Sequence, residues 1–169
     1  MNRVGIGFDV HPLVKGRPLI LGGVKIDYPF GLDGHSDADV LVHALMDALL
    51  GAAGLRDIGY YFPPGEEKWH DADSLILLGQ VNEMLAETGW QVVNADSIII
   101  AEKPTMAPHI GNMCINLASA LKLPACRVAV KATTTEGLGF CGRGEGIAAQ
   151  AVVLIEKVVH LAPRGREAE

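Results

Sequence analysis

Apolar residues form short runs in some segments of this 169-residue chain and recur every three or four residues in others. Short runs bounded by glycine, proline or aspartate are typical of strands, and the second pattern is typical of one face of a helix. Strands are therefore predicted at residues 4–10, 19–26, 92–101, 127–133 and 146–159. Helices are predicted from Ser36 to Gly51 or Gly54, from 73 or 74 to 88, and from 108 to 121.

These elements alternate along the chain, which favours a mixed α/β fold. At this length one domain with a substantial core is expected, and we predict a single domain at residues 1–160. Residues 161–169 are predicted to be a frayed tail, as chain ends often are.

Composition and charge exclude several classes of protein. The chain is 49% hydrophobic and 20% charged, which fits a compact soluble enzyme. Its net charge of −6 argues against binding to nucleic acid, because nucleic-acid modules usually carry a basic face. Three cysteines without CxxC spacing argue against a disulfide framework and fit a reducing compartment. No signal peptide or membrane-length apolar run is visible, so a cytoplasmic location without a membrane partner is expected.

Asp9 and His11 lie two positions apart in the first predicted strand, so their side chains project from the same face. His43, on the first predicted helix, can complete a set of three ligands. Such a set suits Zn²⁺ and leaves its fourth position to water or substrate, which predicts a catalytic zinc site. The alternative is that the histidines are ordinary polar residues, because an Asp-x-His pair by itself is common.

A second cluster of polar residues follows the predicted strand at 127–133. Thr133, Thr134 and Thr135 present consecutive hydroxyls, and the glycines after Glu136 allow backbone N–H groups to point inward and bind an anion. A carboxylate beside a phosphate needs a bridging divalent cation, so Glu136 is a candidate Mg²⁺ ligand. A threonine-rich strand end followed by glycine turns, without any ligand, is an equally weighted alternative. The segment is not a P-loop, because GxxxxGK[ST] is absent.

A third segment, residues 101–108, follows a strand and contains Pro104 and Pro108. Such a loop can be stiff enough to form a flat pocket wall for a base. A plain connector is the interpretation that the sequence alone favours.

Taken together, these segments resemble the 2-C-methyl-D-erythritol 2,4-cyclodiphosphate synthase family. The resemblance spans residues 3–158 and depends most on the Asp-Val-His signature and on the long run rich in threonine and glycine. In chain order the matching segments are 7–11 (GFDVH), 35–37 (HSD), 43–44 (HA), 57–59 (DIG), 62–63 (FP), 72–74 (ADS), 108–110 (PHI), 131–136 (KATTTE) and 142–146 (GRGEG).

The resemblance implies a metal-dependent phosphorus–oxygen lyase of non-mevalonate isoprenoid synthesis. The family cyclises 4-diphosphocytidyl-2-C-methyl-D-erythritol 2-phosphate: the 2-phosphate attacks the β-phosphorus and expels CMP, and no covalent enzyme intermediate is needed. Such a transfer depends on holding nucleophile and leaving group in line and on neutralising charge. Two metal ions and a hydroxyl cradle are the expected equipment.

Individual roles also follow from the resemblance. Zn²⁺ would be held by Asp9, His11 and His43, and Mg²⁺ or Mn²⁺ by Glu136 with the substrate diphosphate. His35 and Thr134 are the candidate catalytic residues, which would stabilise the transition state with help from Ser36. The full substrate-binding set implied is Asp9, His11, His35, Ser36, Asp57, Ile58, Gly59, Phe62, Ala101, Pro104, Thr105, Met106, Ala107, Thr133, Thr134, Thr135, Glu136, Phe140 and Arg143. The family often has lysine where this chain has Thr105.

The family fold is a mixed α/β sheet covered on one side by helices. Three subunits pack their sheets around a threefold axis, with active sites between neighbours. Phe140 and Arg143 would then lie beside a central apolar cavity that admits an isoprenoid diphosphate. The alternative for Arg143 is that it only pairs with Glu145 and stabilises the assembly.

Two other functions stay open from the residues alone. A zinc-dependent phosphohydrolase would use the open zinc position to make hydroxide and would not need the threonine-rich cradle. A noncatalytic metal- or nucleotide-binding protein would need neither Glu136 nor an open coordination position.

Overall fold

The structure, a computed structural model, describes residues 1–158, so the predicted tail at 161–169 lies outside the described residues. Its strands are β1 (Asn2–Lys15), β2 (Leu19–Leu21), β3 (Val24–Ile26), β4 (Phe30–Leu32), β5 (Trp90–Ile100), β6 (Val128–Thr133) and β7 (Gly146–Lys157). Its helices are α1 (Val40–Ala53), α2 (Ile58–Tyr61), α3 (Ser74–Glu87), α4 (Ile110–Ala120) and α5 (Gly139–Gly142), with 3-10 turns η1 (Glu67–Trp69) and η2 (Ala125–Arg127). The predicted mixed α/β class is confirmed.

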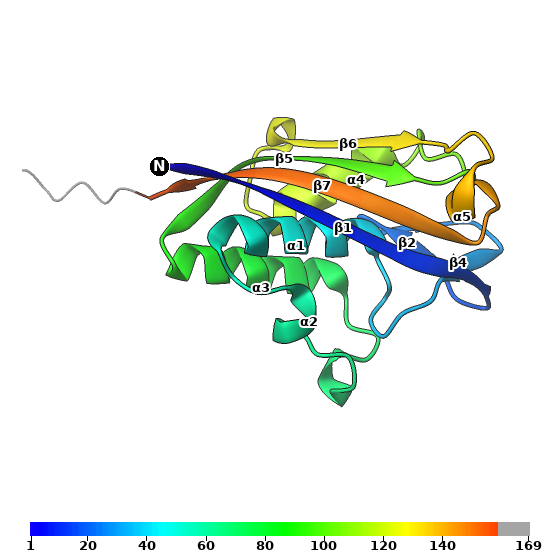
Figure 1. The fold of residues 1–169 in the computed structure, drawn as a ribbon, viewed down its shortest axis with the longest axis horizontal. Coiled ribbons are helices and arrows are strands. Elements are labelled where there is room, and N and C mark those ends of the chain that lie inside the picture. The colour runs from blue at the N-terminus through cyan, green and yellow to red at the C-terminus, as the bar shows by residue number, and fades with distance from the viewer. Residues whose placement is uncertain (159–169) are drawn as a thin grey trace, which may run out of the picture.

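The main sheet has five strands in the order β4-β1-β7-β5-β6, and β2 and β3 form a separate hairpin. Neighbouring strands of the sheet are antiparallel except for β5 and β6, which are parallel. Helix α1 packs on β1 and β7, α3 packs on α1, and α4 packs on β6 (Figure 1). Helices α1, α3 and α4 therefore all lie on one side of the sheet.

The core lies between this sheet face and the helices. Nearly every residue of α1 is buried, because the helix is enclosed by the sheet on one side and by α3 on the other. The apolar side chains of β7 that face the helices, such as Ile147, Val153 and Ile155, are buried at alternate positions, as expected for a strand covered on one side.

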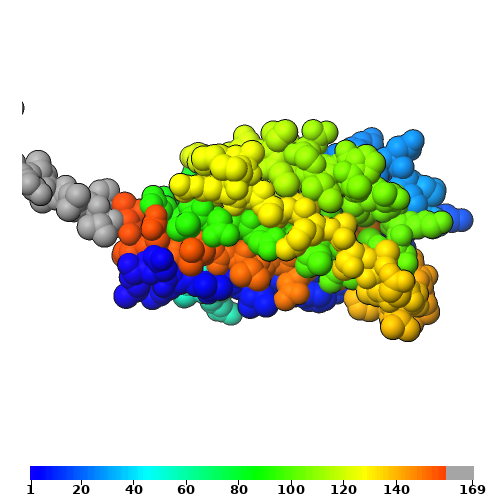
Figure 2. Space-filling view, turned by 90° about the horizontal axis from the view of Figure 1, so that it is seen from above, coloured from blue at the N-terminus to red at the C-terminus, as the bar shows by residue number. Residues whose placement is uncertain are grey.

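The opposite face of the sheet is not covered by any of residues 1–158 and is apolar at β1. Val4, Ile6, Phe8 and Val10 are 68%, 64%, 56% and 42% exposed, and they alternate with residues that face the helices. Figure 2 looks onto this face, where β1 (blue), β7 (orange), β5 (green) and β6 (yellow) lie side by side. A contiguous exposed apolar strand face of this kind marks an interaction surface.

Helix α1 lies directly on β1, because both elements have small residues where they meet. A Cβ added at Gly7 would lie 2.0 Å from the carbonyl oxygen of Ala44, and one added at Gly5 would lie 1.9 Å from that of Ala48. Side chains at these two positions are therefore excluded unless the helix moves away. This close approach lets the side chains that follow Gly7 on β1 meet α1 at short range.

Two predicted elements were wrong in detail. The segment 19–26 is a hairpin of β2 and β3 instead of one strand, because Gly22 and Gly23 adopt positive φ angles of 56° and 68° and reverse the chain. Helix α1 is capped by Asp39 instead of Ser36: Asp39 Oδ1 accepts a hydrogen bond from Val42 N at 3.1 Å. The short elements β4 and α2 were not predicted.

No helix in residues 1–158 is both long and apolar enough to cross a membrane.

Candidate metal and nucleotide site

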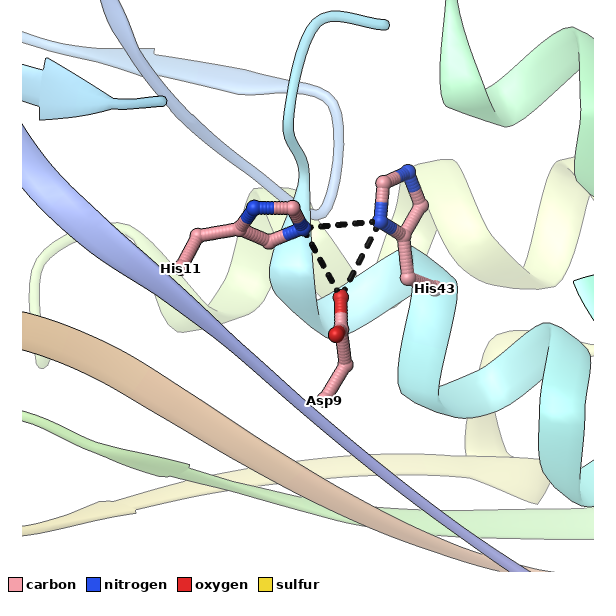
Figure 3. Close-up of side chains that lie close together, drawn as sticks. All are labelled: Asp9, His11 and His43. Atoms are coloured by element: carbon pink, nitrogen blue, oxygen red, sulfur yellow. Dashed lines mark hydrogen bonds and ion pairs between the residues drawn. The ribbon is translucent and has the colours of Figure 1, made fainter. Parts of the chain in front are cut away.

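Asp9, His11 and His43 form one compact cluster of possible metal ligands. Asp9 Oδ2 lies 3.0 Å from His11 Nε2 and 3.0 Å from His43 Nδ1, and the two histidine nitrogens lie 3.2 Å apart. Figure 3 shows Asp9 and His11 projecting from β1 toward His43 on α1, with their three polar atoms turned inward. The predicted grouping of these residues is thus present in the structure.

The packing of α1 on β1 explains why these residues meet. Asp9 and His11 continue the strand face that carries Gly7, because side chains two apart lie on one face. His43 directly precedes Ala44, whose carbonyl oxygen lies against Gly7. The small residue on the strand sets the distance between the two backbones, and that distance brings the His43 ring to Asp9.

The arrangement fits a tetrahedral metal ion. Four ligands at the usual zinc distances of about 2.0–2.1 Å lie about 3.3 Å from one another. The observed separations of 3.0, 3.0 and 3.2 Å come close to that spacing. One carboxylate and two imidazoles are also a donor set that zinc accepts, with one position left open.

Electrostatics favour a cation at the same point. Burial by itself raises the pKa of Asp9, but the hydrogen bonds and charges of His11 and His43 outweigh it and hold that pKa well below its usual range. Burial lowers the pKa of His11, but the hydrogen bond and charge of Asp9 outweigh it and leave that pKa raised. The Asp9 carboxylate therefore stays ionised and favours positive charge beside it, which a divalent ion supplies.

The ring orientation of His11 is fixed from its far side. His11 Nδ1 lies 2.6 Å from the carbonyl oxygen of Asp33. A carbonyl oxygen only accepts, so Nδ1 carries a hydrogen, and Nε2 is the nitrogen whose lone pair is available to a metal ion in the cluster. Metal-binding histidines are commonly oriented by such a backbone contact.

A cavity of about 230 Å³ opens beside the cluster. Eight residues of the sequence-based site set line it: Asp9, His11, His35, Ser36, His43, Ile58, Gly59 and Phe62. Four lining residues were not in that set: Met46, Pro64, Trp69 and Leu77. Asp57 does not line this cavity, and its Oδ1 caps α2 by accepting a hydrogen bond from Tyr60 N at 3.0 Å.

The segment that carries His35 and Ser36 is held from two sides. Arg17 donates hydrogen bonds to the carbonyl oxygens of Gly34 at 3.1 Å and of Ser36 at 2.7 Å. The backbone N–H of Asp71 donates to the carbonyl oxygen of His35 at 3.0 Å. The backbone of this segment is therefore fixed at the edge of the cavity.

A separate cavity of about 300 Å³ gathers the other predicted residues. Its lining includes Ala101, Pro104, Thr105, Met106, Ala107, Thr133 and Thr134. The segment that connects β5 to α4 thus also lines a cavity. The walls come from the ends of the parallel strands β5 and β6, which lie at the same edge of the sheet.

Glu102 shapes the loop after β6 and was not in the sequence-based set. Its Oε1 accepts hydrogen bonds from Thr135 N at 3.0 Å, Gly137 N at 3.1 Å and Thr135 Oγ1 at 3.3 Å. The bond from Gly137 and those from Thr135 lower the pKa of Glu102. The clamped loop presents Glu136 with a φ of 53°, and Thr134 Oγ1 donates to Glu136 Oε1 at 2.7 Å.

Phe140 and Arg143 lie apart from both cavities. Phe140 is 41% exposed, and Arg143 lines a third cavity of about 320 Å³ with Tyr28 and Lys103. The guanidinium of Arg143 donates to both carboxylate oxygens of Glu145, at 2.8 and 3.1 Å. The pairing predicted as the alternative for Arg143 is therefore present.

The metal-type cluster and the threonine-rich loop do not meet within one chain. The two cavities share no lining residue. Strands β7 and β5 separate β1 from β6 in the sheet, so β1 and β6 are roughly 14 Å apart at about 4.8 Å per strand. Neither cavity by itself therefore contains both sets of residues.

The fold and the site together define a class: mixed α/β proteins with an Asp-His-His metal-type site beside a cavity. Residues 2–156 match the model of the YgbB family, and the chain therefore belongs to this family.

Curated relatives agree over nearly the whole chain. A 2-C-methyl-D-erythritol 2,4-cyclodiphosphate synthase of Synechococcus sp. (strain JA-2-3B'a(2-13)) is 58% identical over 153 residues, which cover 90% of this chain and 98% of the relative. One of Geobacillus sp. (strain WCH70) is 60% identical over 157 residues, covering 93% of this chain and 99% of the relative.

Solved structures of synthases with the same name or activity are also similar to this chain in sequence and fold. A CDP-bound 2C-methyl-D-erythritol-2,4-cyclodiphosphate synthase is 36% identical with a TM-score of 0.84, covering 91% of this chain and 100% of that one. The Plasmodium falciparum IspF–CDP complex is 30% identical with a TM-score of 0.81, covering 94% of this chain and 97% of that one. The bifunctional IspDF of Campylobacter jejuni is 44% identical with a TM-score of 0.90, and this chain covers 42% of its length.

Proposed function

We propose that this chain is a 2-C-methyl-D-erythritol 2,4-cyclodiphosphate synthase. It converts 4-diphosphocytidyl-2-C-methyl-D-erythritol 2-phosphate to the 2,4-cyclodiphosphate and CMP, in non-mevalonate isoprenoid precursor synthesis. The observation that carries this proposal is the 58% identity to a curated synthase over 98% of that relative's length. The open Asp9-His11-His43 cluster beside a cavity supplies the chemistry that such a transfer requires.

The reaction is a phosphoryl transfer within one substrate molecule. An oxygen of the 2-phosphate forms a bond to the β-phosphorus, and the bond from that phosphorus to the bridging oxygen breaks. CMP leaves with the electron pair. Binding in line and neutralising charge supply most of the catalysis of such a step, and no covalent bond to the protein is required.

The metal-binding residues follow from this chemistry. Asp9, His11 and His43 would hold Zn²⁺, and Glu136 would hold Mg²⁺ or Mn²⁺ together with the substrate diphosphate. These ions, when bound, withdraw charge from the phosphate oxygens. Thr134 donates a hydrogen bond to Glu136, so its hydroxyl lies beside the carboxylate that would bind Mg²⁺ or Mn²⁺.

Positioning of the substrate is divided between the two cavities. The erythritol end would lie in the cavity of His35, Ser36 and the 57–62 segment, and the cytosine would lie against residues 101–107. The polar edge of cytosine would be recognised there by backbone atoms, because most side chains along 101–107 are apolar or small. Thr133, Thr134 and Thr135 would contact the phosphates.

An active site between subunits completes this assignment. The two cavities are separated within the described chain, and among residues 1–158 the apolar β1 face with Val4, Ile6 and Phe8 is exposed. Packing of three such faces around a threefold axis would cover the apolar strands and bring one subunit's metal ligands to its neighbour's nucleotide pocket. The assembly would have three times the 17.9 kDa chain mass. We propose a cytoplasmic location for the enzyme, because its substrate is charged and water-soluble.

The function is tested by incubating the protein with the cytidine diphosphate substrate and Mg²⁺ and recording phosphorus NMR spectra. CMP with a cyclic diphosphate is the expected product pair. A linear phosphate product would mean that the protein is a phosphohydrolase, and unchanged substrate in the presence of both metals would mean that it only binds metal or nucleotide.

Replacing Glu136 with glutamine separates the two metals. The amide keeps the size and hydrogen bonding of the side chain but loses the charge that holds Mg²⁺. The variant is expected to retain zinc and to lose most activity, which high Mg²⁺ restores only in part. Initial rates across a Mg²⁺ titration measure this, with zinc content as the control. A Mg²⁺ dependence equal to that of the wild type would contradict the assignment of Glu136.

Phe140 and Arg143 are proposed to line a central cavity of the trimer that accepts an isoprenoid diphosphate. An aromatic wall suits the apolar tail, and three arginines suit the anionic head. Geranyl or farnesyl diphosphate is expected to raise the Tm of the wild type more than that of Arg143→Ala, measured by thermal shift. Equal stabilisation of both proteins, with the trimer intact by light scattering, would leave Arg143 only its pairing with Glu145.

A further inference from the structure

A chain of hydrogen bonds leads away from the metal-facing ring of His43 into the protein. On its far side, His43 Nε2 lies 3.1 Å from the hydroxyl of Ser74, the first residue of α3. Ser74 Oγ in turn donates to Asp37 Oδ1 at 2.5 Å, and Ser74 N donates to Asp37 Oδ2 at 3.0 Å. Ser74 is fully buried and His43 is 8% exposed, so the contact between them is shielded from solvent, whereas Asp37 is half-buried.

The direction of these hydrogen bonds follows from their donors and acceptors. The Asp37 carboxylate can only accept, so the single hydroxyl hydrogen of Ser74 points to Asp37. Ser74 Oγ can then offer only a lone pair to His43, and His43 Nε2 must carry the hydrogen. When a metal ion occupies the cluster, a hydrogen on Nε2 leaves the lone pair of the other ring nitrogen, Nδ1, for the metal, on the side of Asp9 Oδ2 and His11 Nε2.

Ser36 cannot set this direction. Its hydroxyl lies at the same 3.1 Å from His43 Nε2 and accepts a hydrogen bond from Ala38 N at 3.2 Å. No carboxylate in residues 1–158 takes the hydroxyl hydrogen of Ser36, so Ser36 can serve His43 as donor or acceptor. Of the two hydroxyls beside His43 Nε2, that of Ser74 is the one fixed in orientation by a carboxylate.

We propose that Asp37 and Ser74 are positioning residues for zinc binding: they hold the His43 ring in the form and orientation that present Nδ1 to the metal. This inference rests on the proposed zinc site and deepens it. Both residues lie outside the set that the sequence predicted, although they belong to the matching segments 35–37 and 72–74. The two segments are also joined by their backbones, since Asp37 N donates to Ala72 O at 3.2 Å.

The test is the affinity for Zn²⁺ of the metal-free protein, measured by competition with a chromophoric chelator at fixed pH, well below the Tm of each metal-free variant. Ser74→Ala is expected to weaken zinc binding about 10–100-fold, the range typical of residues that support a metal ligand. Asp37→Asn is expected to weaken it in the same direction, because an amide can donate to Ser74 Oγ and reverse its hydrogen bond. Ser74→Thr, which keeps the hydroxyl, is expected to bind more tightly than Ser74→Ala.

A matched control comes from another buried serine. Ser97 on β5 is 2% exposed, and its hydroxyl has no hydrogen-bond partner within residues 1–158. Ser97→Ala removes the same atom without touching His43 and should leave zinc affinity unchanged. The visible absorption spectrum of the Co²⁺-substituted protein should change in Ser74→Ala and stay as in the wild type in Ser97→Ala, because it reports ligand geometry.

The His43→Ala variant distinguishes an error in the proposed zinc site from an error in the proposed role of Asp37 and Ser74. If His43→Ala retains wild-type zinc affinity, the proposed zinc site itself is wrong. If His43→Ala loses zinc while Ser74→Ala and Asp37→Asn bind it as tightly as the wild type, the zinc site stands and the positioning role is overturned. If Ser74→Ala does not fold, Asp37→Asn alone decides by the same affinity criterion.

Discussion

Replacing His43 with alanine is expected to strip most of the bound zinc and to abolish cyclisation, while the fold stays largely intact. His43 supplies one of only three protein ligands, and its ring forms part of the cavity wall instead of the centre of the core. The loss of zinc affinity should exceed the roughly 10–100-fold that follows loss of a residue behind a ligand. Zinc content after dialysis and the rate of CMP release are the measurements, with circular dichroism to follow the fold.

Asp9→Asn should give the same result for a different reason. The amide keeps the shape of the side chain but removes the negative charge, which the lowered pKa of Asp9 indicates is present in the folded protein. His109→Ala is the matched control for His43→Ala, because His109 precedes α4, is not part of the cluster and makes no capping hydrogen bond with its side chain, so the zinc content should be unchanged. Full zinc occupancy in His43→Ala would remove His43 from the site.

The second large effect is expected from a single added methyl group at Gly7. The Cβ of Gly7→Ala would lie 2.0 Å from Ala44 O and 2.7 Å from Ala48 N, both backbone atoms of α1. The helix must move away from β1, so the free energy of unfolding should fall by about 3 kcal/mol or more, beyond the ordinary cost of overpacking. Zinc affinity should fall with it, because His43 moves with α1 and Asp9 stays on β1.

Gly51→Ala is the control of opposite sign. Gly51 lies within α1, it is exposed, and a Cβ there would meet nothing within 4 Å. Replacing a helical glycine by alanine should raise the free energy of unfolding by about 1 kcal/mol. Urea unfolding of the metal-free proteins measures both changes. A Gly7→Ala variant as stable as the wild type, with unchanged zinc affinity, would show that the contact between α1 and β1 does not set the geometry of the cluster.

The sequence by itself determined the parts that depend on local order along the chain. The helical spacing of apolar residues identified α1, α3 and α4 to within a few residues, because one buried face repeats every turn. Alternation on β1 placed Asp9 and His11 on one face. Residue chemistry then led to the choice of His43 as a third ligand, and the structure brings all three together.

Other features depended on contacts between residues far apart in the sequence. Ser36 has the side chain of a helix cap, yet Asp39 caps α1, because the tertiary fold directs the Ser36 hydroxyl to His43 instead. The segment 101–107 has no pattern that distinguishes a connector from a pocket wall, and it became a wall only when β6 was paired beside β5.

The separation of the metal cluster from the threonine-rich loop likewise depends on the tertiary structure. Asp9 and Glu136 are both recognisable as candidate ligands from sequence, but the spacing along a chain carries no information on the order of strands in a sheet. That order, β4-β1-β7-β5-β6, puts two strands between the metal cluster and the threonine-rich loop. The hydrogen bond from Ser74 to Asp37 was hidden for the same reason: the residues are 37 positions apart and meet only because α3 packs on α1. Local periodicity specifies which face of an element is buried, whereas long-range packing decides which buried faces meet.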